Sequence, residues 1–173
     1  MTDLCLRQYR QADNMTDRLA AFAAIIDSPA REREPVITDF FQQWQKHPLV
    51  IDKWFTLQAL SHRSEAFADI ERLLQHPAFS LKNPNRVRSL LGAFSQNLAV
   101  FHRIDGAGYR LLAEQILLLD QRNPQVAARL AGPFTRWRRV EPQRRKQMKA
   151  ELERMRAATL SKDLYEIINK SLQ

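Results

Sequence analysis

Apolar side chains recur every three or four residues along almost the whole chain, and proline-containing breaks cut this pattern into short segments. The spacing is that of one face of an α-helix, because an α-helix has about 3.6 residues per turn. The segment 34–46 shows it with the residues Val36, Ile37, Phe40, Phe41 and Trp44. No stretch of four or more residues alternates between apolar and polar side chains as a half-buried strand would. The sequence therefore predicts an all-α fold.

Two of the expected helix starts carry the same signal, an asparagine that can cap the helix and a proline at its first position. They are Asn83-Pro84 and Asn123-Pro124, which lie 40 residues apart. One helix pair fills a similar distance in HEAT and armadillo repeats. About nine or ten short helices with brief loops also fit such an array better than a four-helix bundle. We therefore expect residues 1–173 to form one α-solenoid-like domain of antiparallel helices.

Three segments allow sharper local predictions. Pro133 lies inside a helical pattern and should kink or restart the helix that contains it. Trp54 and Phe55 are expected in the core, and Asp52 and Lys53 are expected to form a local charge pair. The helix that begins at Asn83-Pro84 should carry four apolar residues on its buried face, Val87, Leu91, Phe94 and Leu98.

The chain is basic, with a net charge of +8 and a pI of about 10.1, which raises nucleic acid or an acidic partner as a possible ligand. Residues 136–170 carry eleven Lys or Arg and five Asp or Glu. Both signs are mixed at helical spacing in this stretch, which favours a solvated helix surface over a nucleic-acid groove. Nucleic acid is therefore not expected as a partner.

Features of the ends and the single cysteine bear on the compartment. One cysteine excludes an intrachain disulfide and suits a reducing environment. The N-terminus lacks the basic-then-apolar layout of a secretory signal, and no apolar run approaches the roughly 18 residues of a membrane span. We expect a cytoplasmic protein that makes no contact with a membrane.

Motifs that carry chemistry are absent from the sequence. There is no H-E-x-x-H metal motif, and the four histidines are scattered without ligand spacing. Gly106-Ala107-Gly108 follows no strand and lacks the lysine of a phosphate-binding loop. Cys5 belongs to a chain start that we expect to be frayed. These residues alone predict a helical-repeat domain without a catalytic or metal site.

Six blocks of the sequence stand out: ADNMTDRLAA (12–21), LVIDKWFTLQA (49–59), LLQHPAF (73–79), KNPNRVRSLLGAF (82–94), RNPQVAARL (122–130) and DLYEIINKSL (163–172). In this order they resemble the C-terminal helical domain of the bacterial aminopeptidase N family, the zinc alanyl aminopeptidases. The resemblance extends from about Leu4 to the end of the chain, and the stretches 31–39 and 96–104 depart from the family pattern.

The resemblance implies that this chain is one part of a larger enzyme. In the family, the zinc ligands and the catalytic glutamate belong to a separate domain, so this chain is expected to bind no cofactor and to be inactive alone. Its partners would be the catalytic and β-sandwich domains of the same polypeptide, together with peptide substrates. The helical domain of the family is bowl-shaped, closes over the active-site chamber and presents polar side chains to the substrate.

Three such side chains fall on matching positions of the family motifs, namely Arg88, Gln125 and Arg129. Helical geometry agrees for Gln125 and Arg129, because residues four apart lie on one face. A guanidinium can pair with a peptide carboxylate or carbonyl through its planar fork. We expect these three residues to contact substrate. The residues alone leave an alternative open, a basic helical-repeat module that binds nucleic acid or a protein partner.

Overall fold

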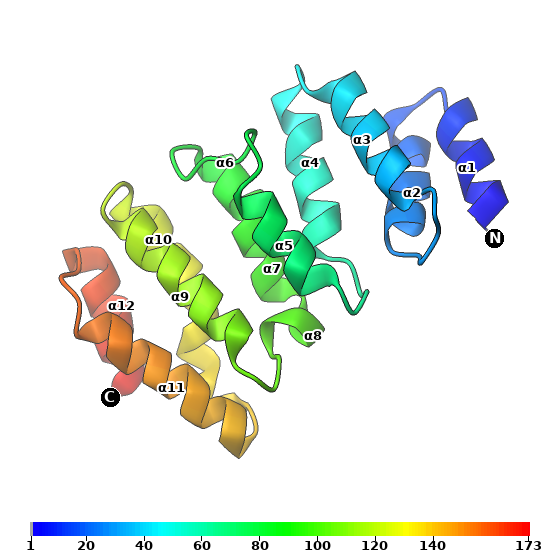
Figure 1. The fold of residues 1–173 in the computed structure, drawn as a ribbon. Coiled ribbons are helices and arrows are strands. Elements are labelled where there is room, and N and C mark those ends of the chain that lie inside the picture. The colour runs from blue at the N-terminus through cyan, green and yellow to red at the C-terminus, as the bar shows by residue number, and fades with distance from the viewer. Residues whose placement is uncertain (1) are drawn as a thin grey trace.

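The computed structural model describes residues 2–173, which form helices joined by short loops, with no strand among them (Figure 1). The first five helices are α1 (Thr2–Gln11), α2 (Met15–Ile26), α3 (Arg33–Trp44), α4 (Pro48–Ala59) and α5 (Ala66–Leu74). A continuous helical stretch follows, made of α6 (Pro84–Val87), the π-helix η1 (Arg88–Gly92) and α7 (Ala93–Gln96). The remaining elements are α8 (Leu98–Phe101), α9 (Ala107–Asp120), α10 (Pro124–Leu130), the 3₁₀-helix η2 (Gly132–Arg139), α11 (Pro142–Arg156) and α12 (Lys162–Leu172). The predicted all-α class is confirmed.

Side-chain caps and prolines set where several helices begin. Asn83 Oδ1 accepts a hydrogen bond from the backbone N–H of Asn85 at 3.0 Å, and Asn123 Oδ1 accepts one from Val126 at 3.2 Å. Each cap satisfies a backbone donor that has no partner inside its helix. A proline follows each of these asparagines, where its missing N–H costs nothing. Both predicted Asn-Pro helix starts are confirmed.

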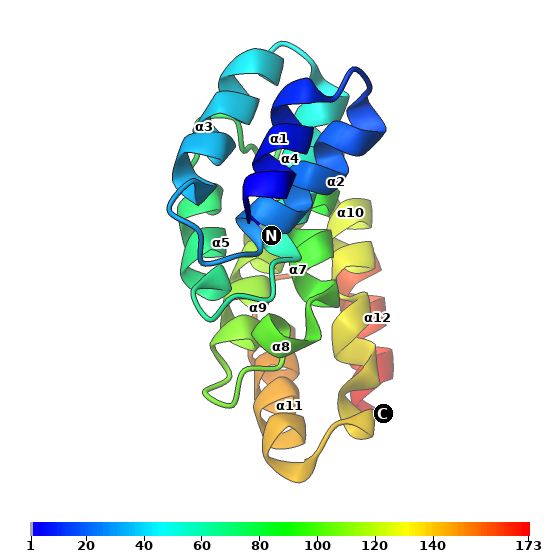
Figure 2. The ribbon, with the colours of Figure 1, turned by 90° about the vertical axis from the view of Figure 1, so that its right-hand side faces the viewer.

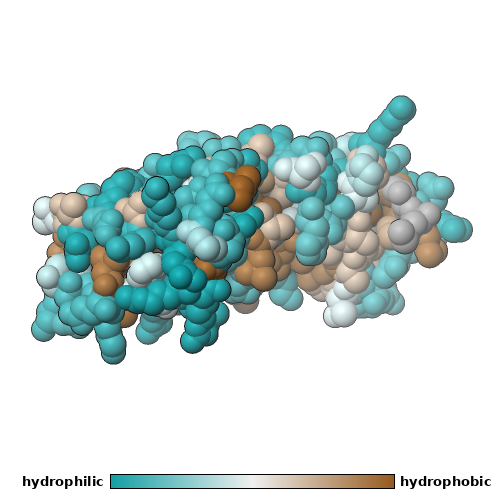
Figure 3. Space-filling view, turned by 90° about the horizontal axis from the view of Figure 1, so that it is seen from below, coloured by the Kyte–Doolittle hydropathy of each residue, from teal (hydrophilic) through white to brown (hydrophobic). Residues whose placement is uncertain are grey.

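The helices stack in chain order into an elongated array. In Figure 1 the array runs from α1 at one end to α12 at the other, and chain neighbours such as α2 and α3, α4 and α5, or α9 and α10 pack on one another. Figure 2 shows two layers, with α3, α5 and α11 on one side and α2, α10 and α12 on the other. This is the arrangement of an α-solenoid. Figure 3 shows apolar surface beneath the middle and the N-terminal half of the array, whereas its C-terminal end is largely hydrophilic.

One apolar core runs through the array. Six phenylalanines distributed along it are at most 1% exposed, namely Phe22, Phe40, Phe55, Phe94, Phe101 and Phe134. Trp54 is 3% exposed, and its Nε1 donates a hydrogen bond to the carbonyl oxygen of Ile37 at 3.1 Å. This bond ties α4 to α3 and satisfies the one polar atom that the indole ring brings into the core. The predicted burial of Trp54 and Phe55 is confirmed.

The start of the chain differs from the expectation of a frayed segment. Residues from Thr2 onward form α1, and Cys5 in this helix is half-buried and packs against the core. Tyr9 is 5% exposed, and its hydroxyl donates to Asp39 Oδ2 at 2.7 Å. A short terminal helix is stable here because it docks through these contacts, which local sequence signals do not contain.

Two further local predictions are wrong. Leu98 does not lie on a buried face, because the helical stretch ends at Asn97 and leaves Leu98 67% exposed. Asn97 is buried, and its Nδ2 donates to the carbonyl oxygens of Ala59 and Ser61 at 3.0 and 2.7 Å. A second error concerns a charge pair. Asp52 pairs with the buried guanidinium of Arg86, with Oδ1 and Nε 3.1 Å apart, and its expected pairing with the adjacent lysine does not form.

Two segments depart from α-helical geometry. Arg88–Gly92 forms a π-helix, the wide type that occurs often at functional sites. Gly132–Arg139 forms a 3₁₀-helix directly after α10, with Pro133 in its first turn. The predicted restart at Pro133 is confirmed, since proline cannot donate the hydrogen bond that would continue α10.

The turn between α8 and α9 depends on two glycines. Gly106 has a φ of 69°, the left-handed conformation that glycine adopts without strain. Gly108 lies against the backbone of α8, where a β-carbon would come within 2.3 Å of the carbonyl oxygen of Phe101. The absence of a side chain at both positions therefore allows α9 to begin in contact with α8.

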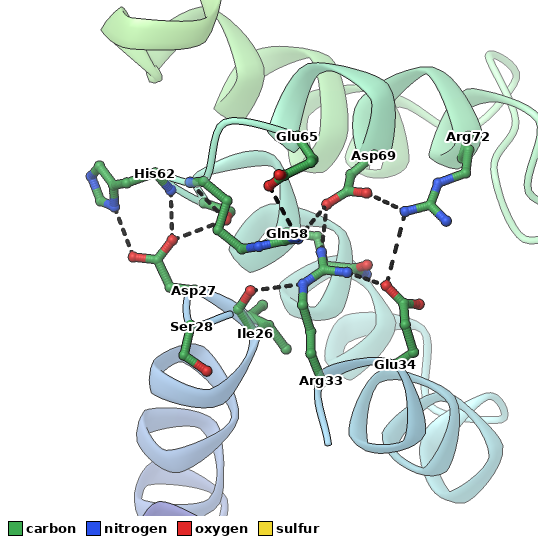
Figure 4. A network of polar contacts seen from close by, with 12 residues as sticks. Ile26, Asp27, Ser28, Arg33, Glu34, Gln58, His62, Glu65, Asp69 and Arg72 are labelled. Atoms are coloured by element: carbon green, nitrogen blue, oxygen red, sulfur yellow. Dashed lines mark hydrogen bonds and ion pairs between the residues drawn. The ribbon is translucent and has the colours of Figure 1, made fainter. Parts of the chain in front are cut away.

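An ion network joins the elements of the N-terminal half (Figure 4). Asp69 of α5 accepts hydrogen bonds from Arg33 Nη2 at 2.5 Å and from Arg63 Nη1 at 3.2 Å, and it also pairs with Arg72. Arg33 Nε donates to the carbonyl oxygen of Ile26 at 2.9 Å. The side chains of Arg33 and Asp69 are only 5% and 4% exposed. The network therefore links the start of α3 to α5 and to the end of α2.

Candidate functional site

A pocket of about 910 Å³ lies where α10, η2 and the middle of α11 face the middle of the array. Its lining falls into an apolar part and a polar part. The apolar residues are Val87, Leu98, Phe101, Val126, Leu130, Pro133, Val140 and Met148. The others are Arg88, Gly92, Ser95, Gln96, His102, Arg129, Gly132, Thr135, Arg136 and Arg139. Apolar lining with a few polar groups is typical of ligand-binding pockets.

Both non-α helices contribute residues to this pocket. In a 3₁₀-helix residues three apart share a face, so Pro133, Arg136 and Arg139 form one row, and Gly132 and Thr135 of the adjacent row line the pocket as well. Arg88 and Gly92 of the π-helix complete this part of the lining. The sequence therefore uses two uncommon helix types where it must turn several pocket-lining residues toward one space.

The pocket carries positive charge without a neutralising acid. Four arginines line it and no aspartate or glutamate does. Arg88 Nη1 donates to Asn85 Oδ1 at 3.3 Å, whereas within residues 2–173 no side-chain hydrogen bond or ion pair engages Arg129, Arg136 or Arg139. All four arginines are solvent-exposed. Apart from the Arg88 Nη1 donor, their guanidinium donors can bind an anionic or carbonyl-bearing ligand.

His102 contributes no further charge to this pocket at neutral pH. Its Nδ1 lies 2.7 Å from the hydroxyl of Tyr109. Burial, followed by the nearby guanidinium of Arg144, lowers the pKa of His102 below the ordinary histidine value. Burial also raises the pKa of Tyr109 to about 12, so the phenol stays protonated and can donate to His102 Nδ1. His102 therefore lines the pocket as a neutral imidazole, and its hydrogen bond with Tyr109 holds the ring in place.

Of the three residues expected to contact substrate, two line the pocket and one does not. Arg88 and Arg129 line the same pocket, although 41 positions separate them in the chain (129 − 88). Gln125 is exposed on α10, one turn before Arg129, and does not line the pocket. Sequence reasoning missed Arg136 and Arg139. The signal for them was their spacing of three residues after Pro133, which acquires meaning only once that segment is a 3₁₀-helix.

The described residues do not fit a metal ion. Across residues 2–173, no three side chains of His, Cys, Asp or Glu come together in a way that could hold one. The same part of the chain contains no helix long and apolar enough to cross a membrane.

Comparison with known protein families assigns this helical array to one of them. A family of ARM-repeat domains, described as a domain of unknown function (DUF3458_C), matches residues 1–173. The chain belongs to this family. ARM repeats are stacked helices, so the family assignment agrees with the solenoid seen in the structure.

Curated relatives extend the family assignment. The chain is 44% identical over 173 residues to aminopeptidase N of Haemophilus influenzae, 43% over 171 residues to that of Escherichia coli and 40% over 169 residues to that of Caulobacter vibrioides. These matches cover 99%, 98% and 96% of this chain but 20% of each relative. The chain spans about a fifth of the length of the curated relatives it matches.

A solved structure gives the same result in three dimensions. The chain superposes with a TM-score of 0.95 and 31% identity on a crystal structure of Legionella pneumophila aminopeptidase A in complex with aspartic acid. The match covers 99% of this chain and 20% of that one. The resemblance to the C-terminal helical domain of aminopeptidase N is thereby confirmed.

Proposed function

We propose that this chain is the C-terminal capping domain of a zinc-dependent aminopeptidase N, which removes N-terminal amino acids from peptides. Zinc and the catalytic residues would lie in another domain of the same polypeptide, together with a β-sandwich domain, so this chain would be inactive alone. The identity of 40–44% to three enzymes named aminopeptidase N supports this role. The cytoplasm is the compartment we propose, because the chain has a single cysteine.

The pocket provides the observation that carries a substrate-contacting role. Arg88 and Arg129 come from different elements, η1 and α10, yet both line the 910 Å³ pocket. Guanidinium groups donate hydrogen bonds to peptide carbonyl and carboxylate oxygens, and the apolar lining can receive a side chain. Gln125 would contact substrate from outside the pocket, at the exposed start of α10. No residue of the pocket is proposed to act as an acid, base or nucleophile.

Arg129→Ala in the full-length protein should raise KM or change selectivity among peptides, with little change in fold stability. The loss of a hydrogen bond from a charged donor predicts a fall in kcat/KM of roughly 10- to 100-fold for substrates that reach Arg129. Steady-state kinetics on a series of peptides of increasing length measures the effect. Thermal unfolding of the same variant measures stability, and we expect it to stay close to the unsubstituted protein because Arg129 is exposed.

Arg122→Ala provides a matched control for this experiment. Arg122 is an exposed arginine just before α10, and it does not line the 910 Å³ pocket. Its replacement removes the same charge and should leave kcat/KM unchanged. Equal kinetic effects of the two substitutions, or a large loss of stability with unchanged kinetics for Arg129→Ala, would contradict the proposed substrate contact.

The alternative of a nucleic-acid-binding module has less support. Several cations of α11 pair with neighbouring acids, among them Arg154 Nη2 with Glu151 at 2.7 Å and Lys149 Nζ with Glu153 at 3.5 Å. Such pairing is typical of a solvated helix surface. We expect no binding to a duplex DNA or an RNA of mixed sequence at about 50 mM salt. Binding that weakens steeply with added salt in a filter or anisotropy assay would support the alternative instead.

A further inference from the structure

Two of the four pocket arginines, Arg136 and Arg139, have no role in the function proposed above. We propose that Arg136 and Arg139 form a carboxylate-binding subsite that holds the anionic end of a peptide in the 910 Å³ pocket. The peptide nature of the ligand rests on the proposed function. The anion-binding chemistry rests on the pocket itself.

The arrangement of η2 separates its arginines by orientation. Arg136 and Arg139 are three residues apart on a 3₁₀-helix, so their side chains leave the same face, and both line the pocket. Arg138, between them, is turned away from the pocket. Its guanidinium lies 4.3 Å from the ring centre of Trp137, and its Nη1 donates to the carbonyl oxygen of Ser171 at 2.7 Å. One arginine of this run is therefore structural, and two face the same space.

The charge of this pocket is not balanced by the protein. Glu141 follows the lining residue Val140, but its carboxylate accepts hydrogen bonds from the backbone N–H groups of Gln143 and Arg144, both at 2.8 Å. It also pairs with Arg144 Nη1 at 3.1 Å. Glu141 therefore caps the start of α11 and does not neutralise the pocket arginines. The space beside Arg136 and Arg139 is left electropositive.

Other hollows of the molecule carry less unbalanced positive charge than this one. The hollow lined by Lys82 and Arg122 also lacks an acid, but it holds two cations and not four. The hollows next to Arg33 also contain Glu34, and one of them contains the buried Asp69. Arginine charge is neutralised there by the ion network of Figure 4. Four arginines that face one space without an acid repel one another, and an anionic ligand relieves this repulsion. Among these hollows, the 910 Å³ pocket therefore has the most unbalanced positive charge, and we assign the anion to it.

The apolar lining narrows the class of anion. Leu98 is 67% exposed and Pro133 and Val140 are partly exposed, and these apolar residues line the pocket beside the arginines. An apolar side chain adjacent to a carboxylate fits this surface, whereas a small inorganic anion would leave it uncovered. The carboxylate can come from the free C-terminus of a peptide or from an aspartate or glutamate side chain. Both offer the two oxygens that an arginine fork binds.

Direct binding to the 173-residue chain tests the subsite. Three probes are used: N-acetyl-alanyl-phenylalanine as the free acid, the same compound as its C-terminal amide, and N-acetyl-aspartyl-phenylalanine amide. NMR titration measures the affinity of the chain for each probe. We expect at least one carboxylate probe to bind about tenfold or more tightly than the uncharged amide. Preference for the free acid identifies the C-terminal carboxylate as the source, and preference for the aspartyl amide identifies a side chain. Equal binding of all three probes would overturn the proposal.

Substitutions assign that preference to residues. Arg136→Gln and Arg139→Gln should each remove most of the difference between acid and amide, and Arg136→Lys should keep part of it because the charge remains. Arg156→Gln is the matched control, since Arg156 is exposed at the end of α11 and does not line the pocket. A preference that survives both Gln substitutions, or that falls equally with Arg156→Gln, would show that the subsite lies elsewhere.

Gly132 allows a test that leaves every charge in place. A β-carbon at Gly132 would have no neighbouring atom within 4 Å, and the residue lines the pocket. Gly132→Leu should therefore fill pocket space without strain and weaken binding of the preferred probe at least about fivefold. Undiminished binding would contradict the location. This experiment measures binding to the isolated chain, so its failure is distinguishable from a failure of the kinetic test in the full-length protein.

Discussion

Replacing Gly108 with alanine should lower the free energy of unfolding by roughly 3 kcal/mol. The new β-carbon would lie 2.3 Å from the carbonyl oxygen of Phe101 and 2.9 Å from that of Val100. Both are backbone atoms of α8, so no side-chain rotation relieves the clash, and α8 must move away from α9. Alanine is a better helix former than glycine by about 1 kcal/mol, which does not offset that displacement. Urea denaturation followed by circular dichroism measures the loss.

Gly132→Ala is the control for this experiment. The site meets no atom within 4 Å of the added carbon, and its φ is not positive. Alanine there should be neutral or stabilise by up to about 1 kcal/mol, because it reduces the freedom of the unfolded chain. Equal stability of the Gly108 and Gly132 variants would mean that the close approach of α8 and α9 does not constrain the fold.

Asp69→Asn should destabilise the protein by roughly 3–5 kcal/mol. The asparagine keeps the shape of the side chain but removes the negative charge that Arg33, Arg63 and Arg72 share. Arg33 is 5% exposed, and its remaining acidic partner would be Glu34, whose side chain is 61% exposed and therefore screened by water. A buried charge that loses its partner is expensive, because water cannot replace the missing interaction. Denaturant unfolding of the variant measures the effect.

Glu65→Gln is the matched control for the network. Glu65 pairs with Arg63 at 3.0 Å, but its side chain is 60% exposed, so the same isosteric change should cost far less than Asp69→Asn. The double variant Arg33→Met, Asp69→Leu should recover a large part of the loss, since a buried ion pair can be exchanged for apolar residues at little cost. If Asp69→Asn is no more harmful than Glu65→Gln, the network of Figure 4 is not a stabilising element.

The elements that follow local rules are predictable from the sequence. At the Asn-Pro helix starts, Asn83 and Asn123 accept hydrogen bonds from backbone N–H groups only two or three residues later. Such short-range interactions can be predicted from the sequence alone. Elements that depend on distant contacts cannot be predicted in this way. Asn97 ends its helix by bonding to Ala59 and Ser61, 38 and 36 positions earlier in the chain. The docked α1 and the pairing of Asp52 with Arg86 belong to this second group.

The residues of the candidate site also fall into two groups, those that the sequence indicated and those that only the folded structure revealed. The resemblance directed attention to Arg88 and Arg129, and the structure brings both to one pocket. Arg136 and Arg139 could not be distinguished from Arg138 in the sequence, because all three belong to one basic run. Their separation requires the 3₁₀ geometry of η2 and the contact of Arg138 with Trp137. Helix type is set by packing as well as by propensity, so this distinction became visible only in the folded chain.

The stacking of helices in chain order also bears on how this domain can diverge. Every residue that lines the 910 Å³ pocket lies between Val87 and Met148, whereas the network around Asp69 joins elements that precede them. In an array whose repeats contact mainly their neighbours, stability is nearly a sum of local terms. Substitutions in α1–α5 can therefore change how long the domain survives heat or proteolysis without reaching the pocket. Substitutions between α6 and α11 can alter which ligand is selected, and some of them, such as those at Gly108, change stability as well.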